Sequence, residues 1–362
     1  MKLNEICSKG KSSLRQKDVI NDGPYSVYGA SGIVGTTSDY QNEIPYVAVI
    51  KDGAGVGRAN ACEPMTSVLG TMQALIPNPN VERDYLLYLV RSLRLGEGFS
   101  GSTIPHIYFK DYGKIEVPLP SLEAQKWIVS QLGLIEAQIE QAEAQITQFD
   151  QLVKSRFVEM FGDLEHGYKC PSCELCSVAE VGSSKRVFKS ELLSEGVPFY
   201  RGTEIADLSA GKPARPNLFI SKEHYEKLIA ATGRPEAGDL LLPSICPDGQ
   251  IWCVNTDAPF YFKDGRVLWI RPNRDAIDGV YLRHALSTMF QMSFSSIASG
   301  TTFAELKIFL LKGLNIPLPN LKTQKEFAAF VQQVDKLKFI AQRQIEKLQE
   351  LYDSLAQEYF GV

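Results

Sequence analysis

The chain contains one segment twice. The sequence VPLPSLEAQKWIVSQL, which begins at Val117, aligns without a gap with IPLPNLKTQKEFAAFV, which begins at Ile316, at an offset of 199 residues. Identical residues at this offset include Pro118 and Pro317, Gln125 and Gln324, and Phe161 and Phe360. A period of this length is far beyond that of solenoid repeats. The repeat therefore predicts that a whole domain, together with the helix that follows it, has been duplicated.

Each copy predicts a long helix directly after its Pro-Leu-Pro segment, where Ser121 and Asn320 are favourable N-caps. In the first copy, apolar residues then alternate in steps of four and three, which is the pattern of a coiled-coil seam. They are Ile128, Leu132, Ile135, Ile139, Ala142, Ile146, Phe149 and Val153. The second copy continues this pattern except at Lys338, which indicates a frayed or polar stretch. About 40 helical residues span roughly 60 Å, so we expect an antiparallel helix pair; the alternative is that each helix docks only on its own domain.

The segments outside the helices predict mixed domains of strands and short helices. Short β-rich runs such as PYVAVI and RVLWIRP are broken by Gly, Pro, Asn and Asp in both halves. We therefore predict an α+β fold with a pseudo-two-fold internal repeat, in which two long helices form an antiparallel coiled coil between two similar globular domains. The expected segments are a first domain at 1–114, a central helix at 115–163, a second domain at 164–313 and a distal helix at 314–362.

The composition narrows the class of protein. The net charge of −4 does not by itself indicate nucleic-acid binding. The acidity is concentrated in residues 115–163, which carry 3 basic and 8 acidic side chains. No apolar stretch approaches the length of a membrane span. The 7 scattered cysteines favour a reduced, cytoplasmic protein.

The duplicated arrangement resembles the specificity (S) subunits of type I restriction–modification systems. The resemblance covers the whole chain and rests on IEVPLPSLEAQKWIV and LNIPLPNLKTQKEFA, each of which closes a domain and precedes a long helix. The domain openings are also similar: GPYSVYGASGIVG at Gly23–Gly35 matches one common form, and VGSSKR with GVPFYRGTEI, within Val181–Ile205, matches another. The resemblance implies that segments 1–114 and 164–313 are target-recognition domains and that the helices are the spacer between them.

The resemblance also implies a DNA-binding subunit that is not an enzyme. In this family, each target-recognition domain reads one half of a split sequence in double-stranded DNA. Two methyltransferase (M) subunits dock on the helices and domains, and methylate adenine N6 with S-adenosylmethionine. Restriction (R) subunits can join them and cleave unmodified DNA. We therefore expect no cofactor, no metal and no membrane contact for this chain itself.

Candidate DNA contacts are polar and basic residues in Gly-rich loops, because phosphate contacts position a protein on DNA and base-edge contacts specify the sequence. In the first domain we select Tyr28, Ser31, Lys51, Arg58, Ser102, Thr103 and His106. In the second domain we select Lys185, Arg186, Arg201, Thr203, Lys212, Arg215, Thr301 and Thr302. Candidate contacts with an M subunit are the large side chains outside the seam, Trp127, Phe157, Met160, Phe161 and Phe360. The alternative for each residue is an ordinary role in a turn, on the surface or within the fold.

Two other functions remain open at this point. The sequence VAVIKDGAGVGRAN at 47–60 has the strand and glycines of a nucleotide-binding loop, so the chain could be a stand-alone enzyme that binds a nucleotide or S-adenosylmethionine through Gly53–Gly57. The second half, however, replaces Gly55 and Gly57 by Ile251 and Cys253. A coiled-coil adaptor without DNA is the other alternative. We interpret CPSCELC, with Cys170, Cys173 and Cys176, as a turn entering a strand, and a metal site as the alternative.

Overall fold

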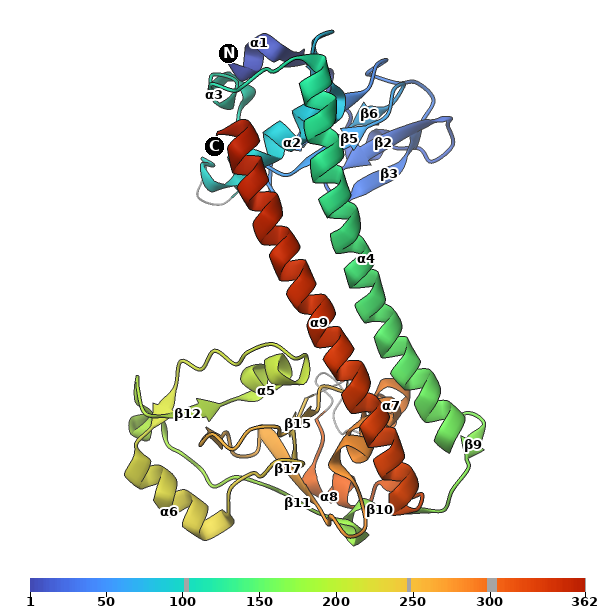
Figure 1. Ribbon diagram of the computed structural model, residues 1–362, viewed down its shortest axis with the longest axis vertical. Coiled ribbons are helices and arrows are strands. Elements are labelled where there is room, and N and C mark those ends of the chain that lie inside the picture. The colour runs from blue at the N-terminus through green and yellow to red at the C-terminus, as the bar shows by residue number, and fades with distance from the viewer. Residues whose placement is uncertain (101–103, 246–248, 298–304, 362) are drawn as a thin grey trace. The chain divides into compact units, whose positions relative to one another are not determined.

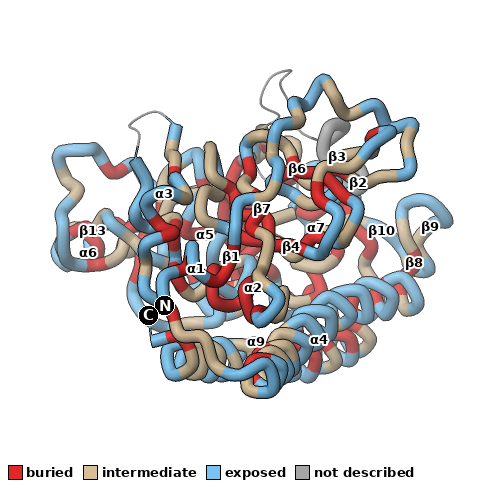
Figure 2. The backbone as a smooth tube through the Cα atoms, turned by 90° about the horizontal axis from the view of Figure 1, so that it is seen from above, coloured by how far each residue is buried: buried red, intermediate tan, exposed pale blue. Residues whose placement is uncertain are grey.

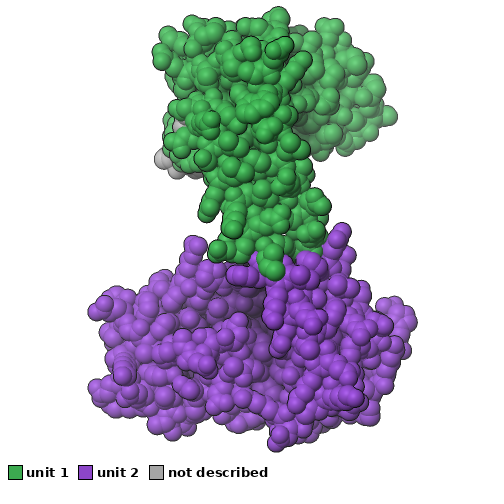
Figure 3. Space-filling model, viewed as in Figure 1, with its two compact units in different colours: residues 1–146, 340–362 green, residues 147–339 purple. Residues whose placement is uncertain are grey.

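The computed structural model describes residues 1–100, 104–245, 249–297 and 305–361. The chain divides into two compact units, Met1–Ile146 with Ile340–Val362 and Thr147–Phe339 (Figure 3). Each unit therefore contains one of the expected domains and one part of each long helix. The long helices are α4 (Leu122–Phe161) and α9 (Leu321–Phe360) (Figure 1).

The first unit is built on an antiparallel sheet with the strand order β1-β7-β4-β5. These strands are β1 (Cys7–Lys9), β4 (Tyr46–Ile50), β5 (Ala59–Cys62) and β7 (Met72–Pro77). A second sheet has the order β3-β2-β6, with β2 and β6 parallel; it consists of β2 (Tyr25–Gly29), β3 (Gly32–Thr37) and β6 (Ser67–Val68). The helices are α1 (Leu3–Ile6), α2 (Arg83–Ser92) and α3 (Phe109–Tyr112), with 3-10 turns η1 (Gln16–Asp18) and η2 (Leu95–Glu97). Buried residues follow the central strands, and all of β4 is buried (Figure 2).

The second unit repeats this topology. Its central sheet has the order β11-β17-β14-β15, from β11 (Ala179–Ser183), β14 (Leu240–Pro243), β15 (Trp252–Cys253) and β17 (Val267–Pro272). Its second sheet has the order β13-β12-β16, again with one parallel pair, from β12 (Val197–Tyr200), β13 (Phe219–Ile220) and β16 (Tyr261–Phe262). Further elements are α7 (Gly279–Ile297), α8 (Ile308–Lys312), β8 (Gly162–Asp163), β9 (Gly167–Tyr168), β10 (Ser172–Glu174), β18 (Asn315–Pro317), η3 (Leu175–Ser177) and η4 (Lys189–Glu191). The second domain also contains α5 (Gly202–Ser209) and α6 (Lys222–Thr232), which have no counterpart between the equivalent described strands of the first. The predicted α+β duplication is confirmed.

The long helices run antiparallel within each unit (Figure 1). In the first unit, the ring of Trp127 near the start of α4 lies 5.6 Å from that of Tyr359 at the end of α9. In the second unit, Phe157 near the end of α4 lies 5.5 Å from Phe327 near the start of α9. The predicted seam positions are buried or half-buried throughout. The antiparallel pair predicted from the heptad pattern is thereby confirmed.

Lys338 does not fray the helix that contains it. Its Nζ lies 2.6 Å from Asp150 Oδ1 on the neighbouring helix, and α9 continues to Phe360. The seam is therefore polar at this point, which was one of the two expectations.

A buried glutamine joins each long helix to the domain before it. Gln125 and Gln324 are fully buried, and each side-chain amide donates to two backbone carbonyls and accepts from one backbone N–H at 2.8 to 3.2 Å. The partners of Gln125 are Asn80, Pro120 and Glu82, and those of Gln324 are Ala276, Pro319 and Asp278. The glutamine that the repeat preserves thus connects the Pro-Leu-Pro segment to the start of α2 or α7.

Candidate nucleic-acid interface

The glycine-rich loop at 51–58 connects two antiparallel strands, β4 and β5. Gly53, Gly55 and Gly57 have positive φ angles of 87°, 87° and 86°. A Cβ on Gly57 would lie 2.2 Å from the backbone nitrogen of Gly96, so this glycine permits a close backbone approach. A nucleotide-binding loop of the expected kind leads from a strand into a helix. The structure therefore does not favour the alternative of a nucleotide cofactor at this loop.

Two of the predicted DNA contacts, Lys51 and His106, meet at Asp52. His106 Nδ1 lies 2.7 Å from Asp52 Oδ1, and Lys51 Nζ contacts the same carboxylate. Burial raises the pKa of the Asp52 carboxyl, but hydrogen bonds from Lys51 and His106 outweigh it and leave this pKa below its ordinary value. The carboxylate is thus charged at neutral pH and orients both side chains. We call Lys51, Asp52 and His106 the Asp52 cluster.

Asp52 was not among the residues selected from the sequence. The loop that carries His106 is fixed to the end of β4 by two backbone hydrogen bonds, from Gly53 N to Pro105 O and from Ile107 N to Lys51 O, both 3.0 Å. The signal that could have identified Asp52 is its Asp-Gly turn, but only the folded chain brings residues 52 and 106 together.

A second carboxylate cluster lies in the second domain. Glu305 Oε1 accepts a hydrogen bond from Ser244 Oγ at 3.1 Å and lies 3.4 Å from Arg266 Nη1. Lys307 Nζ lies 2.5 Å from Glu305 Oε2, and this hydrogen bond is the largest cause of the lowered pKa of the Glu305 carboxyl. None of these residues is among the DNA contacts predicted from the sequence. We call Ser244, Arg266, Glu305 and Lys307 the Glu305 cluster.

Arg58 lines a cleft of about 450 Å³. The cleft is also lined by Arg91 from the last turn of α2, by Arg94 before η2, and by Asn60 and Glu97. Arg91 is paired with Glu136 of α4 at 3.1 Å. A basic residue near a helix C-terminus also interacts favourably with the helix dipole, so Arg91 has a structural role here.

The remaining selected residues of the first domain lie elsewhere. Tyr28 is half-buried on β2, and burial raises the pKa of its hydroxyl. Ser31 is exposed in the turn between β2 and β3. Ser102 and Thr103 lie outside the described residues, as do Thr301 and Thr302 of the second domain.

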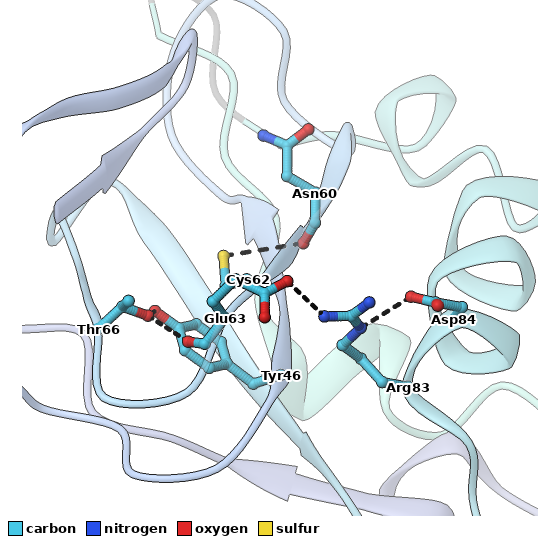
Figure 4. A network of polar contacts seen from close by, with 7 residues as sticks. All are labelled: Tyr46, Asn60, Cys62, Glu63, Thr66, Arg83 and Asp84. Atoms are coloured by element: carbon cyan, nitrogen blue, oxygen red, sulfur yellow. Dashed lines mark hydrogen bonds and ion pairs between the residues drawn. The ribbon is translucent and has the colours of Figure 1, made fainter. Parts of the chain in front are cut away.

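A network of polar contacts holds the chain after β5 against the start of α2 (Figure 4). Arg83 Nη1 lies 3.0 Å from Glu63 Oε1, and Arg83 Nε lies 2.7 Å from Asp84 Oδ1. Burial raises the pKa of the neighbouring Cys62 thiol to about 12, so this thiol stays protonated at neutral pH and is a poor nucleophile. The network supports the frame of the domain.

In the second domain, Arg201 is held by the protein itself. Its Nη2 lies 2.8 Å from Oε1 of Glu204, a residue only 4% exposed, and 3.1 Å from Oδ1 of Asn217. Thr203 donates to the same Glu204 carboxylate at 3.0 Å. Both selected residues therefore stabilise the start of α5, and this structural role limits what they can offer to DNA.

The other selected residues of the second domain lie on its surface. Lys185, Lys212 and Arg215 are exposed. Arg186 is 69% exposed and lies 3.4 Å from Asp264. Among the described residues, no hydrogen bond or ion pair joins these side chains to the Glu305 cluster, although Asp264, the partner of Arg186, accepts a hydrogen bond from Arg266 N at 2.7 Å.

Most of the selected partner contacts are inside the fold. Phe157 and Phe161 are 1% exposed and pack with Tyr281 and Phe327, and Phe360 is 3% exposed and packs on Tyr85. These three side chains are core residues, because they fill the junction between each domain and the helix pair. Met160 is half-buried against the same core, whereas Trp127 is 55% exposed.

The cysteine string has an ordinary structural context. Cys173 lies on β10 opposite Ile316 of β18, and Cys176 is exposed in η3. The described part of the chain contains no group of three His, Cys, Asp or Glu residues that could hold a metal ion. Within that same part, no helix has both the length and the apolar character needed to cross a membrane.

Comparison with known proteins agrees with this architecture. The family described as "Type I restriction modification DNA specificity domain" matches residues 1–148 and 172–350. The MjaVIII specificity subunit of Methanocaldococcus jannaschii is 26% identical, over 73% of this chain and 67% of its own length. A putative type I specificity subunit of Haemophilus influenzae, S.HindORF215P, is 24% identical over 92% of this chain and 85% of its own length.

Solved structures share the fold. The crystal structure of a type I restriction–modification S subunit from M. genitalium matches with a TM-score of 0.61 and 17% identity, over 99% of this chain and 95% of its own. A chain from a study of assembly of the type I system matches with a TM-score of 0.59 and 18% identity, over 99% of this chain and 96% of its own. The family match and the duplicated domains together show that this chain belongs to the specificity subunits of type I restriction–modification systems, which recognise DNA sequences and are not catalysts.

Proposed function

We propose that the chain reads a bipartite target in double-stranded DNA, with one half-site for each target-recognition domain. The observation that supports this division is that the two domains share a strand order but present different polar side chains at equivalent positions. Two readers on one face of DNA need a separation of one helical turn, about 34 Å, or a multiple of it. Each long helix has 40 residues and is about 60 Å long, which is more than one such turn.

We further propose that the chain directs two methyltransferase subunits to adenine N6 and serves as a platform for restriction subunits. The cofactor, S-adenosylmethionine, belongs to the methyltransferase subunits in this proposal. On the chain itself, Trp127 is the partner contact that we retain from the sequence analysis, because its indole is exposed on α4. We also propose that the protein acts in the cytoplasm.

Sequencing of N6-methyladenine in host DNA, with and without this chain, tests the function. We expect one split motif that disappears when the gene is deleted and returns with the intact chain. Methylation of DNA by the purified chain and S-adenosylmethionine, without a methyltransferase subunit, would contradict the proposal.

A further inference from the structure

The Asp52 cluster lies on a backbone frame made by the end of β4 and the loop before α3. Lys51 N donates to Thr71 O at 3.0 Å, which joins the end of β4 to the residue before β7. Ile107 N donates to Lys51 O at 3.0 Å, which brings His106 beside the same strand end. The frame thus fixes where the side chains of Lys51 and His106 begin.

The Glu305 cluster lies on the same frame in the second domain. Ser244 N donates to Arg266 O at 2.9 Å, and Leu306 N donates to Ser244 O at 2.7 Å. Ser244 follows β14 as Lys51 follows β4, and Arg266 precedes β17 as Thr71 precedes β7. Glu305 and Leu306 are related to His106 and Ile107 by the same 199-residue offset that defines the repeat. The two clusters are therefore equivalent positions of the duplicated domain.

The chemistry at these equivalent positions is exchanged. In the first domain, the carboxylate of Asp52 comes from the strand end and the imidazole of His106 from the loop. In the second domain, the carboxylate of Glu305 comes from the loop, and the cations come from Arg266 and Lys307. Each carboxylate nevertheless holds two nitrogen-bearing side chains. These contacts already restrict the rotamers of the long basic side chains. Less conformational entropy is therefore lost when such a side chain binds a ligand.

We propose that the Asp52 and Glu305 clusters are the equivalent base-reading sites of the two domains, in which one carboxylate orients basic side chains toward the acceptor atoms of guanine. This inference rests on the proposed function. Lys and Arg are the residues that most often read guanine O6 and N7 in the major groove. The side chains of Lys51, Arg266 and Lys307 are 29%, 64% and 45% exposed, so part of each remains accessible although its charged end is paired with a carboxylate.

Single substitutions in the full chain, assembled with its methyltransferase subunits, test this role. The variants Asp52→Asn and Glu305→Gln remove the charge that orients the basic groups and keep the shape of the side chain. Lys51→Gln and Arg266→Gln remove the reading groups themselves, and Arg266 is too exposed for its loss to unfold the domain. The matched controls are Asp84→Asn and Glu223→Gln, whose carboxylates are also paired with a basic side chain but lie outside the clusters. The readout is the relative rate of adenine methylation on a DNA library in which each position of the motif is varied.

We expect each cluster variant to lose about tenfold of its preference for guanine in one half-site only. Asp52→Asn and Lys51→Gln should affect one half, Glu305→Gln and Arg266→Gln the other, and the controls neither. An unchanged motif in assembled, active complexes would overturn the inference. A uniform loss of methylation at every sequence would also overturn it, because that pattern belongs to phosphate contacts. If wild-type complexes methylate no split motif, the proposed function itself fails.

Discussion

Replacing Gln324 by Leu should destabilise the second unit strongly, because it removes a buried polar connector without changing the volume of the site much. The substitution leaves the N–H of Asp278 and the carbonyls of Ala276 and Pro319 without their side-chain partner. A buried backbone group that loses its hydrogen bond costs about 1 to 3 kcal/mol. The expected loss in the free energy of unfolding is therefore about 3 kcal/mol even at the low end of that range.

The duplication supplies a replicate for this experiment, and an exposed glutamine on α9 supplies the control. Gln125→Leu in the first unit removes the same three kinds of contact and should cost a similar amount. Gln349→Leu changes an exposed glutamine on α9 and should shift stability by less than about 0.5 kcal/mol. Urea unfolding measures the total loss of stability. Native-state hydrogen exchange then assigns that loss to one unit, since each variant should lower amide protection in its own unit. A loss below about 0.5 kcal/mol for Gln324→Leu would refute the reasoning.

Three further changes test individual contacts. Gly57→Ala should cost about 2 to 4 kcal/mol in urea unfolding, because Gly57 has a φ of 86° and its Cβ would overlap Gly96. Burial holds the pKa of His284 well below its usual range, so the unfolded chain binds a proton below about pH 6.5 while the folded chain does not. The free energy of unfolding should therefore decrease as the pH is lowered below about 6.5. The decrease should reach up to about 1.4 kcal/mol per pH unit in the wild type and should be less steep in His284→Gln. Arg201→Ala should reduce the free energy of unfolding by about 1 to 2 kcal/mol and so lower the melting temperature, because the buried carboxylate of Glu204 loses its guanidinium partner. An unchanged melting temperature would contradict the structural role and favour DNA binding as the role of Arg201.

The architecture could be predicted from the sequence because its determinants are local or periodic. Proline fixes the end of each extended segment, the N-cap begins each helix, and the four-three spacing buries one face of α4 against α9. The internal repeat then extended each inference to the other half. The sequence did not indicate which helix side chains are covered by distant segments: Phe161 and Phe360 lie on the long helices and pack against Tyr281 and Tyr85.

The candidate site was predictable only in part, for the same physical reason. Lys51 and His106 were selected for their chemistry, and the fold brings them together because Ile107 bonds to the end of β4. Glu305 was missed because the selection favoured basic and hydroxyl side chains, and Ser244, Arg266 and Lys307 were missed because only the folded chain gathers them around Glu305. A carboxylate that orients two cations can be identified only when the three groups are seen in space.

The duplicated domain separates residues that maintain the frame from residues that distinguish the two readers. Tyr85 and Tyr281 make the same hydrogen bond, to Pro118 O at 2.9 Å and to Pro317 O at 3.0 Å, so the junction with the helix pair is fixed in both halves. At the ends of β4 and β14, by contrast, the backbone bonds agree while the charged groups change places. Because the backbone frame imposes the position and not the chemistry, we expect variation there to alter what a domain reads at little cost to stability. The proposed recognition of two different half-sites by one duplicated fold agrees with that division.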